Sequence, residues 1–173
     1  MWWKKKDEDI KIGFVAGLSG KYSALGISIR DGFTLAFDEI DYKINNKIVT
    51  IIQKDDKQDI KEAKKAIEYF IKNDTKLVVG NATSSMTAIT FPIVNNQKDM
   101  LLISATASGS DFTAKDDNFL RIQVEHSVKR YRVVSEYIYN KGYKNIFFIY
   151  DSKNISYSKG YENIFQDMFV SNG

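Results

Sequence analysis

The chain has 173 residues, 43% of them hydrophobic and 13% aromatic, which is enough apolar side chain for a core of one or two small domains. Its formal charge of +3 comes from 25 basic and 22 acidic residues without a run of five or six like charges, so nucleic acid is not an expected partner. The absence of cysteine excludes a disulfide framework, and with one histidine a metal would have to rely on carboxylates. We expect no cofactor.

Residues 1–9, MWWKKKDED, are predicted to form a flexible leader. They contain no apolar run of seven or more residues, so this chain shows no export signal. Trp2 and Trp3, followed by three lysines, resemble the interfacial flank of a removed membrane anchor. An ordinary flexible end explains the same residues equally well.

Residues 10–104 alternate between short apolar runs and amphipathic stretches. The apolar runs predict buried strands at 10–16, 47–56, 76–80 and 100–104. Helices are predicted between them: one with an apolar stripe at Ile29, Phe33, Ala36, Phe37 and Ile40, one that starts after Asp59, and one at 85–96. This order is typical of an α/β fold with an open, mainly parallel sheet that has helices on both faces.

Residues 105–173 begin with a loop rich in serine and glycine. Beyond it the pattern predicts an extended segment at 119–124, a helix at 127–141, a strand at 145–151 and a helix at 157–170. No repeat with a fixed period and no low-complexity tract is present.

The candidate binding residues lie in loops that follow the predicted strands. In an open parallel sheet, ligands bind beyond the carboxyl ends of the strands, where helix amino termini carry partial positive charge. The loops at 81–85 and 105–111 are both rich in hydroxyl groups, which can complete a cradle for a carboxylate. Taken alone, Ser84 or Ser85 could simply cap a helix. The second hydroxyl-rich loop favours a binding site.

Enzyme motifs are missing from the sequence. Ser84 is not in a G-x-S-x-G elbow, and the single histidine, His126, is more typical of a surface or hinge residue than of a Ser-His triad. No phosphate-binding G-x-x-x-x-G-K-[ST] motif occurs. We therefore predict that the protein is not an enzyme.

The order of these segments resembles a known family. DIKIGFVAGLSGKYSALGISIRDGFTLAFDEI, VVGNATSSMTAITFPIV, MLLISATASGSDFT and NIFFIYDSKNISYSKGYENIF are similar, in order and spacing, to segments of the type 1 periplasmic solute-binding proteins that bind branched-chain amino acids. The resemblance implies a first α/β lobe at 10–120, and at 121–173 the crossover and first part of a second lobe, which is incomplete.

The resemblance also implies ligand-binding residues. By position, Ser84 would offer its hydroxyl and amide to a ligand carboxylate, with Ser85 beside it, and Thr106 would offer a backbone carbonyl to an ammonium group. Ser108 would contribute a hydroxyl and an amide, and Tyr157 an aromatic ring from the second lobe.

The expected function is an extracytoplasmic solute-binding domain for a small polar ligand, an amino acid or related carboxylate, that serves uptake by an ABC transporter. The alternative is the ligand-sensing domain of a membrane receptor or kinase. Expected partners are the ligand and an ABC permease or signalling domain. Members of the family are about twice as long, so this chain should leave an unpaired strand edge and uncovered apolar surface. The chain is then expected to be either a fragment of a longer protein or a homo-oligomer in which a second copy covers the exposed lobe surface. The predicted location is periplasmic or extracytoplasmic, with or without a membrane tether.

Overall fold

The structure is a computed structural model, in which residues 9–124 and 126–172 are described. The predicted open sheet is confirmed, with six strands in the order β2-β3-β1-β4-β5-β6. All neighbours pair in parallel except β2 and β3. The strands are β1 (Ile10–Ala16), β2 (Lys43–Ile44), β3 (Lys47–Asp55), β4 (Leu77–Gly80), β5 (Leu101–Ser104) and β6 (Phe119–Arg121).

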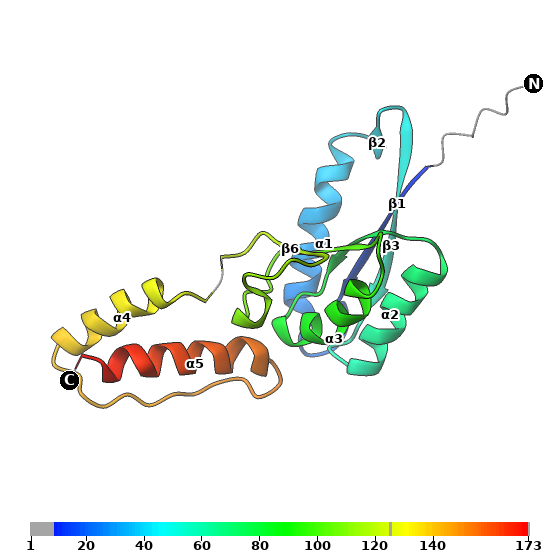
Figure 1. Ribbon diagram of the computed structural model, residues 1–173. Helices are drawn as coiled ribbons and strands as arrows, with labels where there is room; N and C mark the ends of the chain where they lie inside the picture. The colour runs from blue at the N-terminus through cyan, green and yellow to red at the C-terminus, as the bar shows by residue number, and fades with distance from the viewer. Residues whose placement is uncertain (1–8, 125, 173) are drawn as a thin grey trace, which may run out of the picture.

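Helices cover both faces of this sheet (Figure 1). α2 (Ile60–Lys72) and α3 (Ser84–Asn95) pack on one face, over a core formed by Val15, Ala66, Ile67, Phe70, Val78, Val94, Met100 and Leu102. Phe14 is the neighbour of Val15 in β1 and points to the opposite face, where it stacks on Phe33 of α1 (Ser23–Asp38) at 5.5 Å between ring centroids. The α/β architecture predicted from the periodicity is therefore present.

α1 is less buried than its apolar stripe predicts. Phe33 and Phe37 are partly buried and pack edge to face, whereas Ala36 and Ile40 are exposed. The helix meets the sheet chiefly through β1, which lies against only part of its length. The apolar stripe correctly placed the helix but overestimated its burial.

A second unit follows the sheet. It contains α4 (Val128–Asn140) and α5 (Ile155–Val170), which lie side by side and run in the same direction, and residues 141–154 lead from the end of α4 back to the start of α5 (Figure 1). Phe165 of α5 is buried and packs against Phe148 of the returning segment at 5.4 Å between ring centroids. A short 3₁₀ turn, η1 (Ser110–Phe112), leads from the β5 loop toward the start of α5.

The strand predicted at 145–151 is wrong. These residues alternate between inward and outward side chains, with Phe148 half-buried and Phe147 and Ile149 88% and 91% exposed, but they form no strand pairing. A strand needs a neighbour to receive its backbone hydrogen bonds, and none of the strands among the described residues lies beside this segment. The alternation therefore marks an extended chain that is unpaired.

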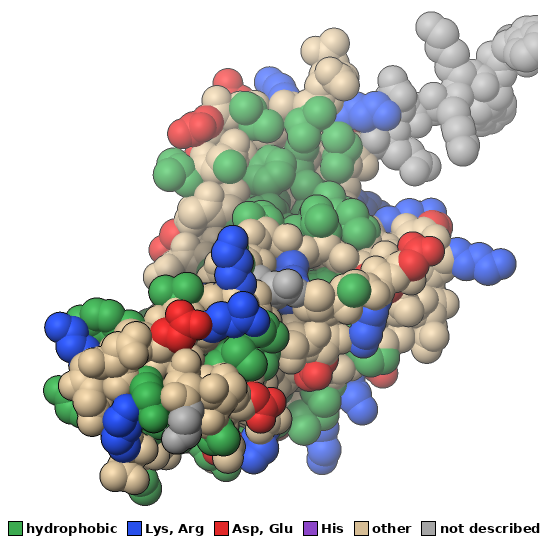
Figure 2. Space-filling model, turned by 60° about the vertical axis from the view of Figure 1, so that its left-hand side comes forward, with side chains coloured by type: hydrophobic (Ala, Val, Ile, Leu, Met, Phe, Trp, Pro, Cys, Tyr) green, Lys and Arg blue, Asp and Glu red, His purple; other side chains and the backbone are tan. Residues whose placement is uncertain are grey.

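The predicted leader lies almost wholly outside the described residues, which begin at Asp9. The Asp9 carboxylate accepts a hydrogen bond from the Ile48 amide at 3.3 Å, which ties residue 9 to the sheet. Figure 2 shows hydrophobic side chains on the surface around α1 and again on the α4–α5 unit. The exposed apolar side chains include Leu35, Ile40, Val133, Tyr137 and Phe147.

Candidate functional site

The candidate site lies at the carboxyl ends of β4 and β5, where the two hydroxyl-rich loops are bonded to each other. Ser104 ends β5, and its hydroxyl donates to the Asn81 carbonyl at 2.9 Å while it accepts from the Ala107 amide at 3.0 Å. The Thr106 hydroxyl donates to the Ala82 carbonyl at 2.6 Å. The loops at 81–85 and 105–111 therefore lie together, and the carboxylate cradle predicted for them stays a prediction.

Ser84 begins α3 and joins the two loops through its side chain. Its hydroxyl oxygen accepts from the backbone amides of Ser108 and Gly109, both at 3.2 Å, and the residue is only 1% exposed. The helix cap is Thr83, whose hydroxyl accepts from the Met86 amide at 3.4 Å. The interpretation that Ser84 or Ser85 simply caps the helix is therefore wrong.

Ser85 lies at the contact between the sheet and the α4–α5 unit. Its amide donates to the Asn154 side-chain oxygen at 3.1 Å, and its hydroxyl accepts from the Ser156 amide at 3.2 Å. The Ser156 hydroxyl in turn donates to the Asp111 carboxylate at 3.1 Å. An oxygen acceptor therefore already lies on the free amide at the start of α3, the position expected for a carboxylate oxygen.

Asn81 and Asp56 form a buried polar pair beneath these loops. The Asn81 side-chain amide donates to the Asp56 carboxylate at 2.8 Å, and the Asn81 side-chain oxygen accepts from the Thr90 hydroxyl at 2.5 Å. Burial raises the pKa of Asp56 above its usual value, against the opposing effect of the Asn81 hydrogen bond. These contacts fix the start of the 81–85 loop from below.

Tyr157 lies in the first turn of α5 and reaches the site through His126. The two rings pack edge to face, with 4.8 Å between their centroids. Tyr157 is 44% exposed and lines a cavity of about 250 Å³ between the 148–151 segment and α5, together with Phe148 and Tyr161. The structure thus brings Ser84, Ser85 and Ser108 together, with Tyr157 at their border.

His126 was missed as a site residue. Its ring is bonded at both nitrogens, with Nε2 3.2 Å from the Ser108 hydroxyl and Nδ1 2.5 Å from the Tyr131 hydroxyl. At 6% exposure it is buried, so the expectation of a surface residue is wrong. Its place between β6 and α4 agrees with the alternative that it lies at a hinge. Burial, and then the charges of Arg130 and Arg121, lower the pKa of His126.

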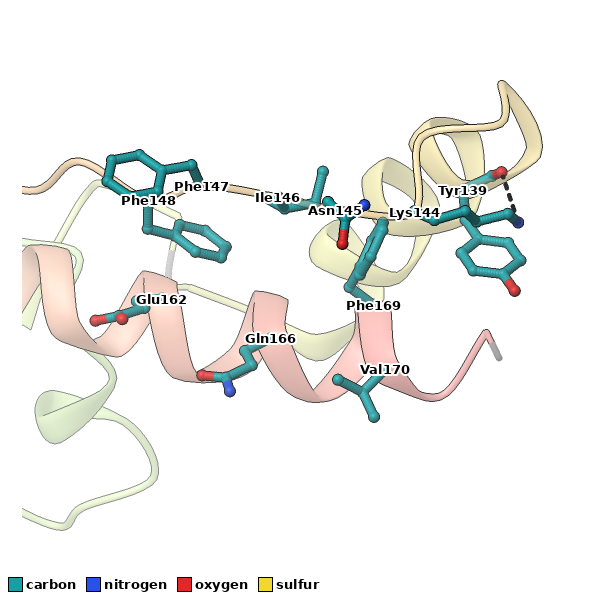
Figure 3. Close-up of a pocket in the computed structure, with 10 residues that line it drawn as sticks. All are labelled: Tyr139, Lys144, Asn145, Ile146, Phe147, Phe148, Glu162, Gln166, Phe169 and Val170. Carbon is teal, nitrogen blue, oxygen red and sulfur yellow. Dashed lines mark hydrogen bonds between the residues drawn. The ribbon is translucent and has the colours of Figure 1, made fainter.

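A cavity larger than the one beside Tyr157 lies in the α4–α5 unit (Figure 3). It is an open groove of about 800 Å³ between the extended 144–148 segment and α5. Its lining is mixed, with the Phe148 and Phe169 rings, the Gln166 amide and the Glu162 carboxylate. None of the predicted ligand-binding residues lines it.

Residues 9–124 and 126–172 contain no group of three or more acidic or histidine side chains placed to hold a metal ion. No described helix has the length and hydropathy needed to cross a membrane.

Known proteins share both sequence and fold with this chain. The Leu/Ile/Val-binding protein BraC3 of Rhizobium johnstonii is 31% identical over 110 residues, which cover 62% of this chain and 29% of that relative. The leucine-binding protein LivK of Thermotoga maritima superposes with a TM-score of 0.84 at 21% identity, over 95% of this chain and 46% of LivK.

A third comparison is with LivJ of Streptococcus pneumoniae, a branched-chain amino acid transporter substrate-binding protein solved with isoleucine. It has a TM-score of 0.80 at 27% identity, and the match covers 94% of this chain and 47% of LivJ. The chain thus spans less than half the length of these proteins. Residues 9–173 match the family model described as periplasmic binding protein, and the chain belongs to that family.

Proposed function

We propose that the chain is part of an extracytoplasmic solute-binding protein that binds a branched-chain amino acid or a related small carboxylate for uptake by an ABC transporter. The observation that carries this proposal is the cluster of Ser84, Ser85 and Ser108 at the start of α3. There, the Ser84 hydroxyl accepts from the amides of Ser108 and Gly109, and the neighbouring Ser85 is bonded through its amide to Asn154 and through its hydroxyl to Ser156.

The cluster suits a carboxylate for physical reasons. The free amides at a helix start carry partial positive charge, and hydroxyl groups can donate to oxygen without bringing a full charge. Asn154 already presents a carbonyl-type oxygen to the Ser85 amide, so the amide is oriented for an oxygen acceptor. A ligand carboxylate would take over that acceptor position from the Asn154 side chain.

The domain division that the resemblance implies is part of the same proposal. Residues 10–120 would form the first lobe, which carries Ser84, Ser85, Thr106 and Ser108. Residues 121–173 would form the crossover and the start of a second lobe, which carries Tyr157. The Ser85–Asn154 and Ser85–Ser156 hydrogen bonds join these two parts at the proposed site. We propose an ABC permease as partner of the whole protein, and no observation favours the sensory alternative.

A ligand screen tests this function. We expect L-leucine, L-isoleucine, L-valine or a small aromatic carboxylate to raise the melting temperature, because a ligand at one hundred times its dissociation constant adds about 2.7 kcal/mol of stability. Ser108→Ala removes only a hydroxyl group, since the Ser108 amide and carbonyl keep their own partners. Loss of a hydrogen bond to a charged ligand should weaken binding by about tenfold or more.

The matched control is Ser28→Ala, which removes an exposed hydroxyl that bonds only within α1. Its affinity should equal that of the unmodified chain. If none of the compounds shifts the melting temperature, or if Ser108→Ala binds as tightly as the control, the serine cluster is not a carboxylate site.

A further inference from the structure

We propose that His126 and Tyr131 are positioning residues that fix the Ser108 hydroxyl as a hydrogen-bond donor toward an acceptor atom of the ligand. The proposal rests on the proposed function in that the acceptor is a ligand carboxylate oxygen. It assigns a role to two residues outside the serine cluster, and it specifies to which part of a ligand the Ser108 hydroxyl donates.

The three side chains form an unbranched chain of contacts. The Tyr131 hydroxyl lies 2.5 Å from Nδ1 of His126, and Nε2 of the same ring lies 3.2 Å from the Ser108 hydroxyl. The His126 amide also donates to the Ser108 carbonyl at 3.2 Å, so backbone and side chain hold the same pair. Both nitrogens of the imidazole ring are therefore hydrogen-bonded, one to α4 and the other to the loop after β5.

The burial of Tyr131 decides which nitrogen carries the proton. A neutral imidazole donates from one nitrogen and accepts at the other. If Nδ1 carried the hydrogen, it would donate to Tyr131, and the phenolic hydrogen would be left without an acceptor among the described residues. Tyr131 is only 2% exposed, and an unsatisfied buried donor costs about 1–3 kcal/mol. The Nε2–H form instead leaves the hydroxyl hydrogen of Ser108 without a protein acceptor, and there the proposed ligand, or water in its place, can accept it. We therefore infer that the proton lies on Nε2 and that Tyr131 donates to Nδ1.

The ionisation of both groups agrees with this direction. Burial raises the pKa of Tyr131 to about 12, so its hydroxyl keeps the hydrogen that it donates. Burial and the nearby Arg130 and Arg121 lower the pKa of His126, so the ring stays neutral at pH 7. We call these three side chains the relay. Hydrogen bonds in the relay are donated in one direction, from Tyr131 to His126 and from His126 to Ser108.

This direction of hydrogen-bond donation determines which group of Ser108 is left to bind a ligand. Nε2–H donates to the Ser108 oxygen, the Ser108 amide donates to Ser84, and the Ser108 carbonyl accepts from the His126 amide. The group that remains is the hydroxyl hydrogen, which needs an acceptor. An ionised carboxylate only accepts hydrogen bonds, whereas an ammonium group only donates them. Ser108 should therefore select the carboxylate end of an amino acid.

The first test reads the tautomer without any ligand. His126 is the single histidine of the chain, so long-range ¹H–¹⁵N NMR of the imidazole gives one unambiguous pattern. At pH 7.5 we expect the Nε2–H form, and we expect Tyr131→Phe to raise the fraction of the Nδ1–H form. A wild-type chain in the Nδ1–H form, or an unchanged pattern in Tyr131→Phe, would overturn the relay.

The second test measures affinity for L-leucine and L-isoleucine by calorimetry. We expect Tyr131→Phe to weaken binding by about tenfold, the loss of roughly one hydrogen bond. Tyr137→Phe is the matched control, because Tyr137 is exposed on the same helix, and it should bind like the wild type. His126→Gln, which keeps a donor near Ser108, should bind more tightly than His126→Leu. Circular dichroism checks that each variant is folded.

The outcomes separate this inference from the proposed function. If the wild type binds neither amino acid, the proposed function is contradicted for L-leucine and L-isoleucine. The NMR measurement of the His126 tautomer then still tests the relay, because it needs no ligand. If the wild type binds and Tyr131→Phe binds equally well, the function stands and the positioning role is overturned. Equal affinity of His126→Gln and His126→Leu would also count against a donor role for the ring.

Discussion

Single side chains at the candidate site are held by partners that come from distant parts of the chain. Asp56 is buried and bonded to Asn81, and Ser84 binds the amides of Ser108 and Gly109. A buried polar group without such partners costs about 1–3 kcal/mol, so these contacts compensate for the burial of the polar loops. Each hydroxyl or amide therefore has one preferred orientation before any ligand arrives.

The pH dependence of stability should reveal His126. Its pKa in the folded protein lies below the usual 6.5 because of burial, then Arg130 and Arg121. The unfolded chain therefore binds the proton more readily, and stability is lost as the pH falls below 6.5. One such group contributes at most about 1.4 kcal/mol per pH unit. Urea unfolding at pH 7.5 and 5.5 should show a smaller loss for His126→Gln than for the wild type. An equal loss in both proteins would contradict the prediction.

Some of the site could be predicted from the sequence, because Ser84, Ser85 and Ser108 follow two strands that a parallel sheet places side by side. The role of His126 could not. Its partners lie 18 residues before it and 5 residues after it, and only the packing of α4 against the β5 loop brings them together. The ligand contacts themselves remain predictions.

Among the elements, α3 depends on its cap. Thr83 accepts from the Met86 amide at 3.4 Å and also donates to the Gln58 side chain at 2.9 Å, which joins the start of α3 to the loop after β3. The capping residue could not be identified among Thr83, Ser84 and Ser85, because all three side chains can accept. The backbone decides, since Thr83 alone of the three is extended and precedes the helix.

Removing this cap should weaken the protein. Thr83→Ala loses both hydroxyl contacts and should lower the free energy of unfolding by about 1 kcal/mol, the usual cost of a lost threonine cap. Thr83→Ser keeps the hydroxyl and serves as the control, with a change of less than half that size. Thermal or urea unfolding measures both. Equal stability of the alanine and serine variants would show that the cap contributes nothing.

Hydrophobic periodicity gave wrong predictions where a strand depends on its pairing partner. Residues 145–151 have the alternation of a strand, but a strand is defined by its neighbour, which periodicity does not report. The short β2–β3 hairpin was missed because it is set by its turn and not by an alternating apolar pattern. It depends on Asn45 and Asn46, which both have positive φ (50° and 64°) and form the two-residue turn, while β2 has only two residues.

Across the whole molecule, apolar surface remains open on both parts. Phe147 and Ile149 point outward from an extended segment that has free backbone groups, and such an edge is a template for pairing with another chain. The exposed rings of Tyr143 and Tyr137 lie in the same unit. Stable monomers rarely expose so much contiguous apolar side chain.

We therefore expect the purified chain to self-associate. Light scattering should give a mass that rises with concentration, and the double substitution Phe147→Lys and Ile149→Lys should lower it, because charged residues on a strand edge oppose pairing. Asn145→Lys adds charge at an exposed position of the same segment without removing apolar surface, and it should have a smaller effect. A folded monomer at the highest concentration tested would rule out the assembly.

Gly109 determines how closely the two parts of the molecule approach. A Cβ atom at this position would lie 3.0 Å from the Ser156 carbonyl oxygen and 3.1 Å from its hydroxyl. Its φ of −53° is open to any residue, so the backbone itself would tolerate alanine. One added methyl group would thus act as a spacer between the β5 loop and the start of α5. Gly109→Ala would thus require Ser156 to move by a few tenths of an ångström, without a change to any hydrogen-bonding side chain.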